Sequence, residues 1–133
     1  MDKPYNDDPL AIIDATFDGD YDLVKRLLEE NAPVNIQNEL GETALMVAVD
    51  EGWFTIAELL IKNSANVNIA DKLGDSPLAV AIWKESRDMI HLLEKNDAKP
   101  VKGDCARKQQ WDEINEDFAH ANAIKNWKYK LKI

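Results

Sequence analysis

A repeat with a period of 33 residues (74 minus 41) runs through most of this chain and limits its possible folds more than any other feature. Two stretches, GETALMVAVDEGWFTIAELLIKNSANVN and GDSPLAVAIWKESRDMIHLLEKNDA, begin at Gly41 and Gly74 and agree in their small and apolar positions. A third copy, DPLAIIDATFDGDYDLVKRLLEENAPVN, stands one period earlier. Such a period is typical of solenoid proteins, in which each unit buries its apolar face only by stacking on a neighbour.

Each copy predicts two short helices joined by a tight turn. Thr43 and Ser76 precede the apolar part of the first helix, where their side-chain oxygens can cap free N–H groups. Pro77 suits the first turn of that helix because its fixed φ is already helical. Gly19 and Gly52 share one repeat position and permit a sharp turn into the second helix. We therefore expect an all-α fold of stacked helix–turn–helix units.

The repeat resembles the ankyrin repeat, which has a 33-residue period and a T-P-L-H-x-A signature. The signature stands here as TALMVA at residues 43–48 and as SPLAVA at residues 76–81, in both cases without the histidine. The resemblance implies a short ankyrin-repeat solenoid at residues 1–98. Its repeats are expected at about residues 8–40, 41–73 and 74–98, followed by a non-ankyrin C-terminal section at residues 99–133.

The two ends of the predicted stack differ in polarity. Asp14 stands where later copies have Val47 and Val80, and Arg26 stands where they have leucine, so the first copy offers water a polar outer face. The third copy keeps apolar residues such as Ile82, so its outer face needs a cover.

The C-terminal section contains a candidate for this cover. Trp111, Ile114, Phe118 and Ala121 recur at three- and four-residue spacing, which is typical of an amphipathic helix. Asp104 follows Gly103 and suits the N-cap. We therefore expect a capping helix at residues 104–126 that packs on the third repeat.

The chain ends in KNWKYKLKI, residues 125–133, where apolar residues and lysines alternate with the period of a strand. Three interpretations stay open. The ribbon folds back on the acidic repeats, adds a strand to the sheet of a partner, or anchors the protein at a membrane surface. We prefer the first because the repeats carry the opposite charge.

The charge of the chain is unevenly distributed. Residues 1–98 hold 20 acidic and 8 basic residues, a balance of −12, and residues 99–133 hold 5 and 8, a balance of +3; together they give the net −9. An acidic body repels nucleic acid and anionic membranes and attracts basic partners. The N-terminus lacks the apolar core of a signal peptide, and no apolar run has the length of a membrane span. We expect a cytoplasmic protein without a nucleic-acid or membrane partner.

The sequence offers no catalytic constellation. His91 and His120 are the only histidines, and no serine or cysteine stands in a recognisable nucleophile context. The five glycines form no phosphate-binding loop. The stretch DGDYDLVKRLLE at residues 18–29 has acidic residues at positions 1, 3, 5 and 12 of a calcium loop, but Leu23 stands where the sharp turn needs glycine. Asp20 and Asp22 instead suit the N-terminus of a helix. We expect no enzyme activity, no cofactor and no metal site.

The ankyrin resemblance implies a binding surface on the concave side, made of the finger turns and the exposed positions of the first helices. In the fingers it points to Glu39, Leu40, Glu42, Lys72, Leu73 and Asp75. In the first helices it points to Phe17, Asp18, Met46, Asp50, Glu51, Trp83 and Lys84. These residues form a mostly acidic surface with apolar anchors, which is typical of a protein-binding site.

Together these features predict a non-enzymatic protein–protein interaction module. The first hypothesis is a small inhibitor or immunity-type protein that occludes a basic partner such as a nuclease toxin, with carboxylates where phosphates would lie. The alternative is a regulatory adaptor that docks a cellular or host protein, or a basic peptide, through the concave face. We expect a monomer that forms a heterodimer with its partner.

Overall fold

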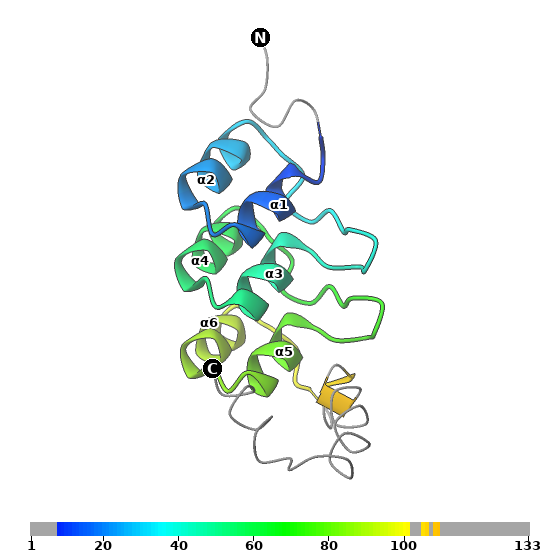
Figure 1. Ribbon diagram of the computed structural model, residues 1–133. Helices are drawn as coiled ribbons and strands as arrows, with labels where there is room; N and C mark the ends of the chain where they lie inside the picture. Colours follow the sequence, from blue (N-terminus) through cyan, green and yellow to red (C-terminus); the bar gives the residue numbers. More distant parts are fainter. Residues whose placement is uncertain (1–7, 102–104, 107, 110–133) are drawn as a thin grey trace, which may run out of the picture.

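The computed structural model describes residues 8–101, 105–106 and 108–109. In this part of the chain six α-helices stack as three pairs in one row (Figure 1). They are α1 (Ala11–Phe17), α2 (Tyr21–Glu29), α3 (Ala44–Glu51), α4 (Phe54–Lys62), α5 (Pro77–Trp83) and α6 (Arg87–Lys95). The first helices of the pairs, α1, α3 and α5, form one layer, and the second helices form the other (Figure 1). The expected all-α repeat architecture is confirmed.

The chain between α2 and α3, and again between α4 and α5, projects to one side as a long loop (Figure 1). We refer to residues 36–42 and 69–75 as the first and second fingers. Asn38 holds the first finger, since its Oδ1 accepts the N–H groups of Leu40 at 3.0 Å and Glu42 at 2.9 Å. Asp71 repeats this arrangement one period later, at 3.0 Å for both bonds. Each finger is therefore a folded turn with its own internal hydrogen bonds.

The helix caps predicted at Thr43 and Ser76 are confirmed. Thr43 Oγ1 accepts the N–H of Met46 at 3.2 Å, and Ser76 Oγ accepts the N–H of Ala79 at 3.2 Å. Pro77 is the first residue of α5. Each hydroxyl satisfies one of the N–H groups that the first turn of a helix leaves without a partner.

The turn between the two helices of a unit needs a left-handed backbone in all three copies. Gly19 and Gly52 have φ of +69° and +83°, as the sequence predicted. The third copy places Glu85 at the same position with φ of +55°. A side chain in this conformation costs roughly 1 kcal/mol, because the Cβ crowds its own backbone.

Replacing Glu85 by glycine relieves about 1–2 kcal/mol of backbone strain and costs about 0.4–1 kcal/mol through the freer unfolded chain, so the free energy of unfolding should rise by about 1 kcal/mol at most. Chemical denaturation of the full chain measures this change. Glu85→Gln is the matched control, since it removes the charge and keeps the Cβ, and it should leave stability within about 0.5 kcal/mol of the parent. An equal gain in both variants would assign the effect to charge rather than to backbone strain.

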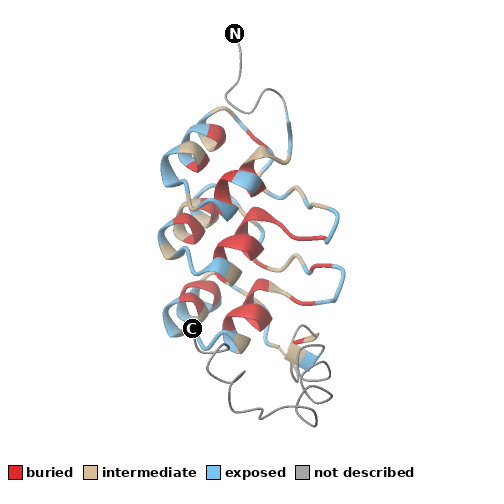
Figure 2. Cartoon of the chain, in the orientation of Figure 1, coloured by how far each residue is buried: buried red, intermediate tan, exposed pale blue. Residues whose placement is uncertain are grey.

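The core lies between the two helix layers and between successive units (Figure 2). Asp14 of the first unit is exposed, whereas Val47 and Val80 at the same repeat position are fully buried, so the polar first face is confirmed. At another position Val49 is 1% exposed beneath the third unit, while its counterpart Ile82 is 46% exposed. Within the described residues the third unit thus keeps an open apolar site.

Two asparagines, one period apart, join neighbouring units. Asn35 Oδ1 accepts the N–H of Asn66 at 2.7 Å, and Asn68 Oδ1 accepts the N–H of Lys99 at 2.8 Å. The Nδ2 of Asn68 also donates to the carbonyl of Asp97 at 3.2 Å. These connections are not predictable from the sequence, because a hydrogen bond across units of the stack leaves no local pattern.

Asn68→Ala should lower the free energy of unfolding by about 1–2 kcal/mol, because it removes the hydrogen bonds of the Asn68 side chain with Asp97 and Lys99. Thermal or urea unfolding measures the loss. Asn68→Asp keeps the acceptor for Lys99 and should lose about half as much. If both variants unfold like the parent, the connection contributes nothing to stability.

The chain returns to the second finger after α6. The N–H of Ala106 donates to Asp75 Oδ1 at 2.7 Å, and Cys105 beside it is buried. Residues 106, 108 and 109 are helical, and the N–H of Gln109 donates to the carbonyl of Cys105 at 3.0 Å. The rest of the predicted capping helix at residues 104–126, and the ribbon at residues 125–133, lie outside the described residues.

No helix in the described part of the chain combines the length and the apolar character needed to cross a membrane.

Candidate functional site

The tips of the two fingers present a pair of exposed leucines. Leu40 is 65% exposed and Leu73, one period later, is 47% exposed. The carbonyl of Leu40 accepts the N–H of Lys72 at 3.0 Å, so the first tip is bonded directly to the second finger. A Cβ added to Gly41 would lie 2.7 Å from the Lys72 nitrogen, which shows how closely the two backbones approach. Both leucines therefore project from a backbone-bonded scaffold.

Three residues that the sequence placed on the binding surface lie inside the molecule. Met46 is 0% exposed, which corrects its expected position on the concave face. The physical reason lies in the repeat position itself, because its counterparts Ile13 in α1 and Ala79 in α5 are also buried, so this face of every first helix packs inward. Glu42 and Asp75 are buried at the bases of the fingers. Glu42 Oε1 accepts from Asn38 Nδ2 at 3.3 Å, and Asp75 accepts from Ala106, so both carboxylates hold loops.

The ten other predicted residues fall into two strips at opposite ends of the first helices. Glu39, Leu40, Lys72 and Leu73 occupy the fingers, at the starts of α3 and α5. Phe17, Asp18, Asp50, Glu51, Trp83 and Lys84 occupy the ends of α1, α3 and α5, where the chain turns into the second helix. All ten are exposed or half-buried.

The turns after α1 and α3 pack directly on one another. A Cβ added to Gly19 would lie 2.6 Å from Cζ2 of Trp53, so the indole of the second turn rests on the glycine of the first. Phe17, Tyr21 and Trp53 on these turns are 43%, 40% and 38% exposed. We refer to residues 17–22 and 50–54 as the turn edge. The sequence interpretation missed Tyr21 and Trp53; the available signal was an indole at a repeat position where the other copies have Asp20 and Ser86.

At the third turn the predicted residues Trp83, Lys84 and Asp50 come together. Lys84 Nζ lies 3.3 Å from Asp50 Oδ1 and 5.1 Å from the centroid of the Trp83 ring. The ammonium group thus lies close to both a carboxylate and an aromatic face, and each of these attracts a cation. Because both charged side chains remain partly exposed to water, the pair itself adds little to stability.

A family model described as ankyrin repeats, in three copies, matches residues 12–104. The chain is an ankyrin-repeat protein. No curated protein sequence matches it. The family indicates a protein–protein interaction module, and a protein partner is therefore the ligand class to consider for the fingers and the turn edge of this ankyrin stack.

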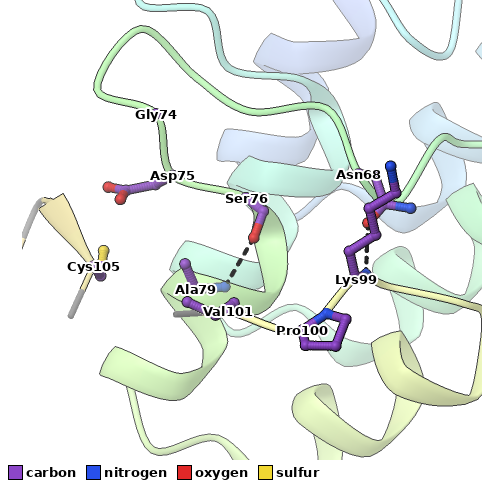
Figure 3. Close-up of a pocket in the computed structure, with 9 residues that line it drawn as sticks. All are labelled: Asn68, Gly74, Asp75, Ser76, Ala79, Lys99, Pro100, Val101 and Cys105. Carbon is purple, nitrogen blue, oxygen red and sulfur yellow. Dashed lines mark hydrogen bonds between the residues drawn. The ribbon is translucent and has the colours of Figure 1, made fainter. Parts of the chain in front are cut away.

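The described part of the ankyrin stack also has a shallow hollow between the second finger, the start of α5 and residues 99–101 (Figure 3). Two hydrogen bonds join residues that line it. The N–H of Ala79 donates to Ser76 Oγ, and the N–H of Lys99 donates to Asn68 Oδ1 (Figure 3). Cys105 faces it from the opposite side and is buried. The hollow is therefore part of the packing where the C-terminal section meets the third unit.

Within the described residues no three His, Cys, Asp or Glu side chains come close enough to hold a metal ion. The acidic stretch that matches part of a calcium loop forms a helix start instead. Asp20 is the N-cap of α2 and its Oδ1 accepts the N–H of Leu23 at 3.1 Å, while Asp22 lies in the first turn. Both carboxylates thus lie at the positive end of the helix dipole, as predicted.

Proposed function

We propose that this ankyrin protein is a small inhibitor of the immunity type, which occludes a basic surface of a partner such as a nuclease toxin. The observation that carries the proposal is the pair of exposed leucines on bonded finger tips. An apolar anchor that is already fixed in the free protein loses little conformational entropy when it binds. Leu40 and Leu73 therefore offer exposed apolar side chains on a fixed backbone, which a partner can bury.

The charge of the stack supports a basic partner. Residues 1–98 carry a balance of −12, and the exposed carboxylates include Glu39 on a finger and Asp18 and Glu51 on the turn edge. Such a field accelerates encounter with a positive surface and disfavours neutral or acidic competitors. Carboxylates that cover a nucleic-acid-binding surface would occupy the places of phosphates.

Affinity capture from the native cells, with stepwise salt elution and mass spectrometry, tests the proposal. We expect one basic partner in stoichiometric amount that survives moderate salt and is lost when the bait carries Leu40→Ala with Leu73→Ala. The purified partner should lose its activity on addition of one equivalent of the ankyrin protein. Several weakly held partners that share a short segment would support the adaptor hypothesis instead, and a partner that remains fully active in the complex would contradict inhibition.

A further inference from the structure

The turn edge differs from the third turn in the charges it carries. Its sequences, FDGDYD and DEGWF, contain five carboxylates, four aromatic residues and neither lysine nor arginine. The equivalent part of the third unit, WKESR, contains both Lys84 and Arg87. The third turn thus supplies its own cations, and one of them, Lys84, pairs with Asp50 of the turn edge. The two segments of the turn edge carry no lysine or arginine of their own.

The third turn shows how this surface holds a cation. Lys84 of the third unit reaches across to Asp50 of the second unit at 3.3 Å, while its ammonium group lies 5.1 Å from the Trp83 ring. The arrangement needs three parts, which are an exposed ring, a carboxylate from the neighbouring unit and a positive charge.

The repeat places two of these three parts at the turn edge. Phe17 occupies the repeat position of Trp83 and is 43% exposed. Glu51 occupies the position of Lys84, and Phe17 stands one period before Asp50, so the repeat relates Glu51 to Phe17 as it relates Lys84 to Asp50. The contact of Trp53 with Gly19 shows that the two turns adjoin, and Asp18 precedes that glycine. The missing part is the cation.

We propose that the turn edge binds a lysine or arginine side chain of the protein partner, seated on the Phe17 ring and paired with Asp18 and Glu51. This inference rests on the proposed function, because it names the chemistry by which a basic partner is recognised. It assigns the leucine fingers and the turn edge to different parts of one interface. The fingers supply apolar anchors, and the turn edge selects for positive charge.

A peptide titration followed by ¹H–¹⁵N NMR on the full chain tests the inference. The probe is acetyl-(Gly-Arg)₃-amide, and the matched control peptide replaces arginine by citrulline, which keeps the shape and lacks the charge. Amide shifts should change at residues 17–22 and 50–54 with the arginine peptide only. Asp18→Asn with Glu51→Gln should weaken binding at least about fivefold.

The ring is tested separately. Phe17→Leu keeps an apolar side chain and should weaken binding about threefold, whereas Phe17→Tyr keeps the aromatic face and should bind like the parent. Asp88→Asn with Glu94→Gln removes two exposed carboxylates of α6 and should change affinity by less than about twofold. An equal loss in this control would mean general attraction to an acidic protein and would overturn the inference.

Two other outcomes would also overturn it. Amide shift changes centred on the fingers would mean that the cation binds at the fingers and not at the turn edge. The second outcome is that lysines of the C-terminal ribbon occupy the turn edge. The turn-edge amides would then shift, without any peptide, in a variant that combines Lys128→Gln, Lys130→Gln and Lys132→Gln. The inference and the proposed function can fail independently. A captured partner that depends on Leu40 and Leu73 but tolerates Asp18→Asn with Glu51→Gln would leave the inhibitor in place and remove the cation site.

Discussion

Gly41→Ala is expected to lower the free energy of unfolding by about 3 kcal/mol. Two effects add up. The residue has φ of +79°, where a side chain costs roughly 1 kcal/mol. The new Cβ would also lie 2.7 Å from the backbone nitrogen of Lys72, and backbone cannot rotate away as a side chain can. Overpacking of this kind costs about 1–3 kcal/mol. Urea unfolding followed by circular dichroism measures the loss.

Gly74→Ala is the matched control. This glycine holds the same repeat position in the second finger with φ of +88°, but a Cβ there meets no atom within 4 Å. Gly74→Ala should lower the free energy of unfolding only by the cost of a side chain at positive φ, about 1 kcal/mol. The difference between the two variants therefore isolates the contact between the fingers. Equal losses would mean that the fingers separate without cost.

Leu40→Ala with Leu73→Ala is expected to weaken the complex with the captured partner about 100-fold. Truncation of a leucine that the partner buries removes apolar contact worth more than about 1 kcal/mol, and two such losses multiply in the dissociation constant. The change should appear mainly as faster dissociation, because the charges that steer encounter are untouched. Surface plasmon resonance with the immobilised ankyrin protein resolves both rates.

The melting temperature of the same variant provides the control for folding. Both leucines are largely exposed, so their truncation removes little buried surface and should shift the melting temperature by no more than a degree or two. Ile82→Ala offers a matched exposed aliphatic residue away from the fingers and should leave the affinity unchanged. Loss of affinity in Ile82→Ala, or retention of affinity in the leucine variant, would place the apolar anchors elsewhere.

The sequence predicted the parts of the fold that depend on local chemistry. The 33-residue period fixed the number and order of the units, and the caps at Thr43 and Ser76 were predictable because a capping hydroxyl acts on its own helix. The polar outer face at Asp14 was predictable because it appears as a departure from the other copies. Repetition makes such departures visible within a single chain.

The parts that depend on neighbouring units were less predictable. Met46 was placed at an exposed position of a first helix, but that position packs inward in all three units, where Ile13 and Ala79 are its buried counterparts. Glu42 and Asp75 are charged, and only the folded fingers show that hydrogen bonds turn them inward. Trp53 was missed because its contact with Gly19 joins two turns that lie far apart in the sequence.

The bonds made by Asn35 and Asn68 have a mechanical consequence. Each ties only one unit to the next, and both run along the row of units rather than across it. A pull on the chain beyond Gln109 would load the bond from Ala106 to Asp75 first and the Asn68 connection next, and would reach the Asn35 connection only after the third unit had separated. Extension of this protein would therefore proceed in discrete steps from its C-terminal end, one unit at a time, with the first unit and its polar face released last.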